Sequence, residues 1–516
     1  MLRKTLITIA VFSLIATSCT KLDEKFEGQL TVDQIGGSSG GGGNVNALLN
    51  GIYASIRGTF QGQAGVYALW EMTTDELIGP TRGGDWDDNG AWRVLHTHRF
   101  DGDHIRIREV WNDLNGVVYS ATDMLRFSPT AQQAAEARFL RAFAQFMILD
   151  GWGQVPYREP GESSITAPKV RVGTEALTFI ISELTAILPA LPDAPATRAN
   201  KDAARVLLMK CYLNKGAFAN RAAPTFDAAD MQQVITIADQ IIASNRYSFS
   251  SNYFDNFAPN NVSIGRENIW TQENLGGVAG GGGDIRSRWH SSVHYNNQPS
   301  GWNGFSTLSD LYNKFEATDK RRGVAYPTNS TVFTNPGNRV NVGFLVGQQY
   351  DMRNDAPLKD RTGANLVFTP QVSIIEKGNN LEVTGIRAYK YMIDFPNADN
   401  GQWDNDYVYF RYADVLLMKA EAQMRTSNAA AGLLIVNSIR INRGATPLAS
   451  LTADNLIDER ARELYLESWR KQDLIRFGKY LMAWQEKPAS DPKYLLFPIP
   501  NGQLAANPNL AQNTGY

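Results

Sequence analysis

The sequence predicts a mainly α-helical protein with a tetratricopeptide-like helical-repeat scaffold of about four helix pairs and a large, irregular, loop-rich insertion that carries short helices and few strands. Apolar residues recur at helical spacing in neighbouring segments, and antiparallel helices paired in this way are typical of helical repeats. One pair is interrupted by residues 246–405, about 160 residues rich in Gly, Asn, Pro and aromatic side chains, far more than a repeat turn requires. The insertion is therefore a second part built onto the scaffold.

The length and composition are those of a globular protein. The chain has 516 residues, of which 43 % are hydrophobic and 20 % are charged, so it can bury a sizeable core. The formal net charge of −2 favours neither nucleic acid nor an anionic membrane surface as a partner. We therefore expect no nucleic-acid partner.

The first 18 residues have the order of a lipoprotein signal peptide. Positive charge at the start is followed by an apolar run, Leu6–Ala16, too short to span a bilayer, and then by small residues immediately before Cys19. We expect residues 1–18 to be removed, Cys19 to carry the lipid, and residues 19–43 to form a linker that ends in a glycine-rich run. The alternative is an ordinary secretory leader with an incidental cysteine. Acidic residues after Cys19 resemble the signal that carries such lipoproteins to the outer surface.

Residues 44–245 are expected to form the N-terminal part of the scaffold, with an aromatic loop at 70–103. A first helix is predicted over 45–56. The helix over 131–150 is expected to be central to the core because nearly all its faces are apolar, and Gly153 is among the glycines placed to end it. The predicted pairs are 104–127 with 131–150, 174–189 with 200–215, 228–244 with 406–426, and 429–443 with 453–469.

Residues 406–516 are expected to contain the last repeat helices and a Pro-rich tail. The third helical run of this part, DERARELYLESWRKQDLIRFGKY, has one apolar face with charge elsewhere, which predicts a single surface helix. Its alternating Arg and Glu side chains are expected to form i,i+4 pairs on that surface. The prolines of the tail, Pro498, Pro500 and Pro508, exclude a helix and predict an extended strap.

Residues of this last quarter resemble the signature of the SusD/RagB family. They are Arg411, Ala413, Asp414, Glu421, Ala422, Glu459, Arg460, Glu463, Leu464, Arg470, Asp473, Leu474, Arg476, Pro498-Ile499-Pro500 and the run from Asn507 to Tyr516. The family comprises lipid-anchored nutrient-uptake proteins on the surface of Bacteroidota. The resemblance implies a helical scaffold with an inserted second half. It also implies a SusC-like TonB-dependent outer-membrane transporter as partner, over which such proteins act as a hinged lid.

Two glycine-rich loops with tryptophans and polar residues carry the candidate binding chemistry. Aromatic rings stack on the C–H faces of sugars, while Asp, Asn and Arg side chains bond vicinal hydroxyls. The bland alternative is that the tryptophans cover the scaffold and the aspartates form Asx-turns. The predicted stacking residues are Trp86, Trp92, Trp289, Tyr295 and Trp302, and the predicted hydroxyl partners are Asp75, Arg82 and Asp85.

Sharper chemistries fit these loops less well. The run Asp85–Gly90 matches the first half of a calcium loop but has His96 where a bidentate Glu is required. His290 and His294 have the spacing of two zinc ligands but lack the Glu that follows the first His in zinc proteases. Asp75 with Glu76, or Asp85 with Asp87, could be imagined as a glycosidase pair, but sequence cannot set their separation. No catalytic residue, metal or cofactor is predicted.

Four functions remain open at this stage. The favoured one is a cell-surface lipoprotein, held to the outer membrane by the lipid on Cys19, that captures an oligosaccharide and passes it to a SusC-like transporter. The second is a RagB-like protein that captures peptides. The third is an enzyme that cleaves glycans, and the fourth is a scaffold protein that binds partners and no small ligand.

Overall fold

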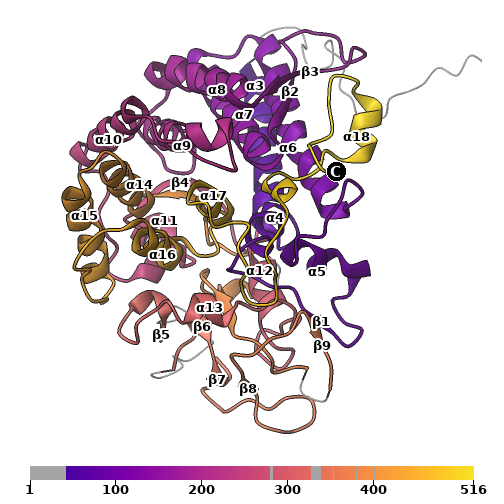
Figure 1. Ribbon diagram of the computed structural model, residues 1–516, viewed down its shortest axis with the longest axis vertical. Coiled ribbons are helices and arrows are strands. Elements are labelled where there is room, and N and C mark those ends of the chain that lie inside the picture. Colours follow the sequence, from indigo (N-terminus) through magenta and orange to yellow (C-terminus); the bar gives the residue numbers. More distant parts are fainter. Residues whose placement is uncertain (1–41, 279–282, 327–338, 353, 379–380, 399–401) are drawn as a thin grey trace, which may run out of the picture. The chain divides into compact units, whose positions relative to one another are not determined.

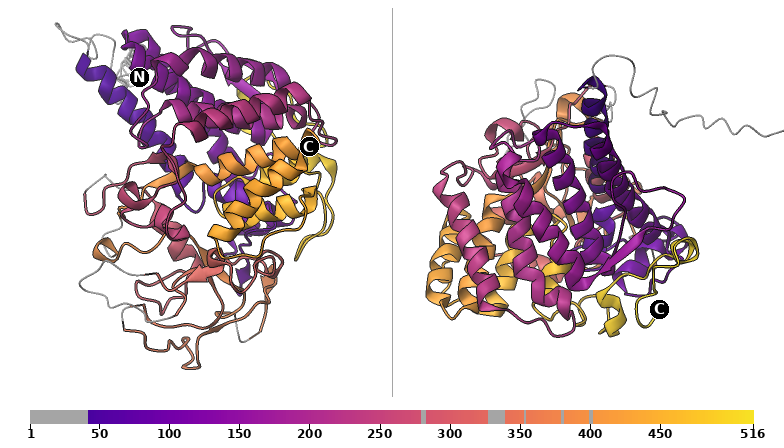
Figure 2. Two further views of the ribbon diagram at one scale, coloured as in Figure 1. Left: turned by 90° about the vertical axis from the view of Figure 1, so that its left-hand side faces the viewer. Right: turned by 90° about the horizontal axis from the view of Figure 1, so that it is seen from above.

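The scaffold is a row of antiparallel helices in which each helix packs on the next. The computed structural model describes residues 42–278, 283–326, 339–352, 354–378, 381–398 and 402–516, and within it Val45–Tyr516 form one unit. The row contains α6 (Ile105–Met124), α7 (Ala131–Trp152), α8 (Gly173–Ile187), α9 (Lys201–Ala219), α10 (Ala228–Ala243), α14 (Tyr412–Arg425) and α15 (Ala429–Asn442). Within this unit, Figures 1 and 2 show these helices gathered at one end and the irregular insertion at the other.

The predicted helical-repeat fold with a large insertion is confirmed. The N-terminus of α7 is fixed by a capping box between Thr130 and Gln133, and the helix ends at Gly153, whose φ of +75° suits a glycine. α10 and α14 pack side by side although the insertion separates them in the sequence. Residues 1–41, which include the predicted leader and Cys19, lie outside the described residues. The division into segments at 245 and 405 stays a prediction.

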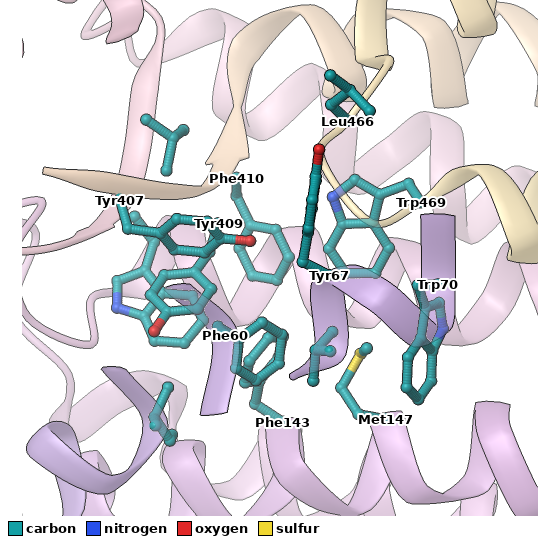
Figure 3. Close-up of a cluster of buried hydrophobic side chains, with 14 of the residues drawn as sticks. Phe60, Tyr67, Trp70, Phe143, Met147, Tyr407, Tyr409, Phe410, Leu466 and Trp469 are labelled. Atoms are coloured by element: carbon teal, nitrogen blue, oxygen red, sulfur yellow. The ribbon is translucent and has the colours of Figure 1, made fainter. Parts of the chain in front are cut away.

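Two short strands bring the ends of the insertion together. β4 (Asn268–Gln272) pairs antiparallel with β11 (Tyr407–Arg411), which leads directly into α14. The Trp270 and Tyr409 rings stack with centroids 4.0 Å apart, and Trp270 also meets Phe143 of α7. Figure 3 shows the cluster that β11 shares with α7, with the ends of α3 (Gly42–Gln61) and α4 (Val66–Met72), and with the turn before α17 (Arg470–Arg476). This shared core fixes the insertion to the scaffold.

The rest of the insertion consists of short elements joined by turns. They are α11 (Asn261–Ile264), α12 (Ile285–Ser292), α13 (Ser309–Tyr312), β5 (Gly323–Val324), β6 (Val342–Leu345), β7 (Gly347–Gln348), β8 (Val367–Phe368), β9 (Ile375–Glu376) and β10 (Arg387–Tyr389). β6 is the centre of a three-stranded sheet with β5 and β10, and β7 pairs with β8. β9 pairs parallel with β1 (Thr81–Arg82), which joins the insertion to the first aromatic loop.

The prediction of a single charged surface helix after residue 453 is wrong. The segment forms α16 (Ala453–Leu464) and α17 (Arg470–Arg476), separated by a turn in which Leu466 and Ser468 have φ of +58° and +66°. The charged residues of both helices are mostly buried. Their partners come from distant elements, so the sequence pattern alone resembles an exposed face.

Glu463 is the centre of this buried ionic network. Its carboxylate accepts hydrogen bonds from Arg321 at 3.0 Å, from Arg411 at 3.0 Å and from Arg443 at 2.8 Å. Among the residues that resemble the family signature, Asp414 pairs with Arg460 and with Lys210 of α9, and Glu421 pairs with Arg476. Asp414, Glu421 and their partners therefore tie helices to one another, and Glu463 ties them to Arg321 of the insertion.

The turn between α16 and α17 is held by two buried carboxyl groups. The backbone N–H of Leu466 donates to Glu76, and the N–H of Ser468 donates to Glu71. Burial raises the pKa of Glu71 to about 7 and raises the pKa of Glu76 well above its ordinary value. A proton therefore stays on this pair in the folded protein under mildly acidic conditions.

Stability is expected to fall as the pH rises through the pKa of this pair. The folded-state pKa of Glu71 lies above its ordinary value of 4.5. The protonated carboxyl therefore contributes its full stabilisation below pH 4.5, and this contribution is lost as the pH rises through about 7. Urea unfolding should show about 2–3 kcal/mol less stability at pH 8 than at pH 5 from this pair. Glu71→Gln should flatten that slope, and Glu175→Gln, at an exposed position on α8, should leave it unchanged. An equal slope in wild type and Glu71→Gln would contradict the assignment.

Two further predictions need correction at the C-terminus. The first is the pairing of 429–443 with 453–469: α15 packs chiefly on α14, and α16 also contacts α14. Leu434 on the outer face of α15 is 74 % exposed because the row of helices ends there. The tail contains a short helix, α18 (Asn501–Ala506), because Pro500 precedes its first turn, where a proline is tolerated. The tail still lies along the scaffold: the Phe497 N–H donates to Gly151, and the Asn513 amide donates to Trp152.

Candidate functional site: a cavity between two aromatic loops

The first aromatic loop is a tight turn between β1 and a short helix. Arg82 and Asp85 exchange backbone hydrogen bonds of 3.0 Å, and the chain then passes through three non-glycine residues of positive φ, Trp86, Asp88 and Asn89. α5 (Ala91–His96) follows. The segment 70–103 predicted as an aromatic loop therefore contains α5. The turn leaves Asp85 exposed and Trp86 partly exposed.

The second aromatic loop follows α12. Its residues Tyr295 and Trp302 reach the surface, while its backbone folds back on α12 through hydrogen bonds from Gly304 and Phe305 to Ser291. The two loops are joined by two bonds: the Trp86 indole donates to the Trp302 carbonyl at 3.0 Å, and the Tyr295 hydroxyl donates to Asp85 at 3.1 Å. Segments about 200 residues apart thus form one surface.

A cavity of about 190 Å³ lies where these loops meet. Three predicted residues line it, namely Arg82, Asp85 and Tyr295. The remaining lining comes from the second loop and from the later insertion: Asn303, Asp360, Arg361, Thr362, Gly378, Leu381, Glu382 and Val383. The structure therefore brings together side chains from three separate parts of the chain.

Trp302 has the arrangement of a stacking platform. The residue is 39 % exposed, and its ring lies stacked on His290, with centroids 5.3 Å apart and planes 23° apart. His290 is held in turn by a hydrogen bond between its Nδ1 and the Ser300 carbonyl. Burial lowers the pKa of His290, which keeps the ring neutral near pH 7. The platform is thus supported from behind, so little conformational freedom is lost when a ligand covers its open face.

Trp86 is supported on one side by the second loop. Its ring centroid lies 4.9 Å from Phe305 and 6.1 Å from Trp92. A Cβ atom on Gly304 would come within 2.3 Å of the Trp86 ring, so only glycine allows this close approach.

Gly304→Ala is expected to displace Trp86 and to break its bond to the Trp302 carbonyl. We expect a loss of stability of about 1–3 kcal/mol, as for overpacked sites, together with weaker ligand binding. Thermal unfolding and a crystal structure of the variant check both parts. Gly84→Ala in the first loop is the matched control, because a Cβ there meets no atom within 4 Å. An unmoved Trp86 ring in Gly304→Ala would contradict the expectation.

Two predicted stacking residues are in the interior. Trp92 is 2 % exposed and Trp289 is 1 % exposed, so neither ring has a free face for a ligand. Trp92 packs on Phe305 and donates to Asp88, while Trp289 packs beside His290 and Trp403. Their assignment to ligand stacking is wrong because they form the hydrophobic support under the loops.

Two predicted hydroxyl partners are already saturated. Asp75 is buried and forms two hydrogen bonds of 2.7 Å with Arg470 of α17. Arg82 uses all five of its N–H groups, on Gly304, Leu381, Ser306 and twice on Thr384. Both assignments as ligand contacts are corrected to structural roles: Asp75 fixes the loop to the scaffold, and Arg82 forms the floor of the cavity.

Charged groups at the rim form a connected set. The Arg361 guanidinium lies 4.3 Å from the Tyr295 ring centroid and pairs with Glu382, which also meets His294 Nε2 at 2.8 Å. Burial lowers the pKa of His294 although the Glu382 carboxylate opposes this. Residues 360–362 and Glu382 were missed by sequence reasoning, because an irregular segment gives no signal of which side chains converge.

The acidic residues considered as glycosidase pairs have other partners in the structure. Asp75 is bound by Arg470, and Asp87 is paired with Arg93. His290 and His294 have separate partners, Ser300 and Glu382, and a group of three metal-ligating side chains is absent from the described part of the chain. What the cavity presents is an aromatic face beside hydrogen-bonding groups of both signs.

Fold and site together define a helical-repeat protein with a loop-lined cavity between its first aromatic loop and an inserted segment. The model of the SusD family matches residues 238–516, more than half of the chain. The protein therefore belongs to the SusD family. This result confirms the family resemblance carried by the last quarter of the sequence.

Similar proteins cover most of the chain. The starch-binding protein SusD of Bacteroides thetaiotaomicron is 26 % identical over 433 residues, which are 77 % of this chain and 75 % of that protein. SusD-like protein P2 of Formosa agariphila is 23 % identical over the full length of both. A laminarin-binding SusD-like protein has a TM-score of 0.70 with 18 % identity, covering 92 % of this chain and 99 % of that one. Surface glycan-binding protein A of Bacteroides uniformis has a TM-score of 0.67 with 18 % identity, covering 91 % and 99 %.

Proposed function

We propose that this protein binds a glycan at the cavity between the two aromatic loops. The observation that carries the proposal is the exposed Trp302 ring, which stacks on His290. The Trp302 carbonyl accepts from the Trp86 indole where the two loops meet, and there the Tyr295 hydroxyl donates to Asp85. Sugar rings offer a C–H face for such a platform and hydroxyls for the polar rim. The names of the relatives support this ligand class, since they describe binding of starch, of laminarin and of glycans.

We further propose that the protein acts at the outer face of the outer membrane, held by a lipid on Cys19. The support is the order of residues 1–18 and the family to which the chain belongs. No helix within the described residues is long and apolar enough to cross a membrane. A SusC-like TonB-dependent transporter is the proposed partner that takes over the bound glycan. Labelling with radioactive palmitate, compared between wild type and Cys19→Ala, tests the anchor.

Calorimetry with a panel of glycans and of mixed peptides tests the ligand class. We expect binding of at least one oligosaccharide and no binding of peptides. Binding of peptides alone would favour a RagB-like role, and binding of no panel member would favour a scaffold role.

Incubation of a bound glycan with pure protein separates binding from cleavage. The relatives are named as binding proteins, and we propose that no bond is broken. New reducing ends that appear with time would show an enzyme instead.

A further inference from the structure

A second cavity, of about 380 Å³, lies in the insertion and shares no lining residue with the first. Its size is within the range of small-molecule sites. It is formed around α13, β5, β6 and β7, and the side chains that matter here are Tyr312, Arg322, Arg339, Gln348, Gln349 and Tyr350.

Two arginines of this cavity are each stacked on a tyrosine. The Arg322 Cζ lies 4.4 Å from the Tyr312 ring centroid, and the Arg339 Cζ lies 3.6 Å from that of Tyr350. Stacking on an aromatic face fixes the guanidinium plane and leaves its N–H edges for other partners. A fixed guanidinium edge is the group that binds carboxylate or sulfate oxygens in two-point contacts.

The lining of this cavity contains no Asp or Glu side chain among the described residues. Arg339 meets Asp355 at 3.1 Å through its Nε, whereas Arg322 has no carboxylate within 4.0 Å in the described part of the chain and donates to the Tyr312 hydroxyl. The first cavity differs, because Asp85, Asp360 and Glu382 line it. The second cavity therefore carries positive charge that its own lining leaves uncompensated.

Amide groups lie beside the two arginines. The Gln348 Nε2 donates to the Gln349 and Leu358 carbonyls, and the Gln349 Nε2 donates to Gly347. Their side-chain carbonyl oxygens accept no hydrogen bond from the described residues. Hydroxyl groups are natural donors to such oxygens. The ligand chemistry indicated is an anionic group on a hydroxyl-rich molecule.

We propose that this cavity is a second saccharide site, which selects a sugar that carries a carboxylate or a sulfate. The arginine edges bind the anionic group, and Gln348 and Gln349 accept from neighbouring hydroxyls. This goes beyond the proposed function, because the site has its own ligand chemistry and does not require the aromatic platform. The segment between β7 and β8 links the two places, since Gln349 lines this cavity and Arg361 lines the first.

The test is calorimetry of the purified protein with three probes of equal length: an oligogalacturonate, a sulfated oligogalactan and a neutral oligogalactan. At least one charged probe should bind more tightly than the neutral one. Whether the oligogalacturonate or the sulfated oligogalactan binds shows whether the site takes a carboxylate or a sulfate. Arg322→Gln and Arg339→Gln should each weaken that binding about tenfold or more, as expected for a lost charge-assisted bond. Arg99→Gln, at an exposed position elsewhere, is the charge-matched control and should bind as wild type does.

Trp302→Ala distinguishes the two sites. It should leave binding of the charged probe at the second cavity unchanged even if the glycan site proposed above is wrong. The proposal is overturned if no charged probe binds more tightly than the neutral one, or if that binding is lost in Trp302→Ala and kept in Arg322→Gln. Binding of an oligoglutamate, with the same arginine dependence and without binding of either charged saccharide, would also overturn it in favour of an acidic peptide.

Discussion

Glu463→Gln is expected to lower the free energy of unfolding by about 3–5 kcal/mol. The substitution keeps the size of the side chain but removes the carboxylate that three buried arginines share. Arg411 retains Glu267 and Glu467, and Arg443 retains Glu267, so the loss arises from excess positive charge held in a buried place. Urea or guanidinium unfolding followed by circular dichroism measures the change.

Asp454→Asn is the matched control for this prediction. Asp454 also lies on α16 and also forms an ion pair, with Lys479, but it is exposed. Exposed pairs contribute little, so this variant should unfold nearly as wild type does. If Glu463→Gln changed stability no more than Asp454→Asn, the network would not hold the insertion to the scaffold.

The buried Glu463 carboxylate also predicts how the stability of the protein changes in acid. Burial by itself raises the pKa of Glu463, but Arg443, Arg411 and Arg321 outweigh burial and hold the pKa well below its usual range. Since the folded-state pKa is depressed, its stabilisation is present above the ordinary value of 4.5 and is lost as the pH falls below it. Unfolding between pH 6 and 3 should therefore depend less on pH in Glu463→Gln than in wild type.

Trp302→Ala is expected to weaken glycan binding by about 2 kcal/mol or more, which is roughly thirtyfold in Kd. Because His290 holds the ring in place, the wild type loses little side-chain entropy when the ring contacts the ligand. The variant loses this contact. Calorimetry with the best glycan of the panel measures the loss. Trp86→Ala should also weaken binding, because the Trp86 indole positions the Trp302 backbone. The loss should be smaller than in Trp302→Ala, since the Trp302 ring itself remains.

Tyr119→Ala provides the control for an exposed aromatic residue. Tyr119 is 50 % exposed on α6 of the scaffold and does not line the proposed site. It should bind as wild type does. Equal affinities in wild type, Trp302→Ala and Tyr119→Ala would place the glycan elsewhere on the protein.

The helical scaffold was predictable because helix formation depends on residues that are close in the sequence. The apolar spacing of residues 131–150 and the glycine after them are enough to define α7. The ionic network was not predictable, since Glu463 and Arg321 are 142 residues apart and a charged helix resembles an exposed one until its partners are known. For the same reason, the break at Leu466 was hidden: it depends on Glu76, which is 390 residues away.

The candidate site was predictable in type and only partly in its members. Tryptophans and glycines marked both loops, and the loops do meet, through Tyr295 with Asp85 and through Trp86 with the Trp302 carbonyl. Composition does not tell which indole faces inward, so Trp92 and Trp289 could not be separated from Trp302. Residues 360–362 belong to a segment with no pattern of its own, and only the fold brings them to the cavity.

Hydrogen–deuterium exchange with and without a saturating panel glycan tests the central proposal most directly. The proposed site predicts slower exchange in peptides that cover residues 82–93 and 290–304, with little change in α8, α9 and α10. Slower exchange confined to the scaffold helices, with both aromatic loops unaffected, would contradict the proposal that the loops hold the ligand.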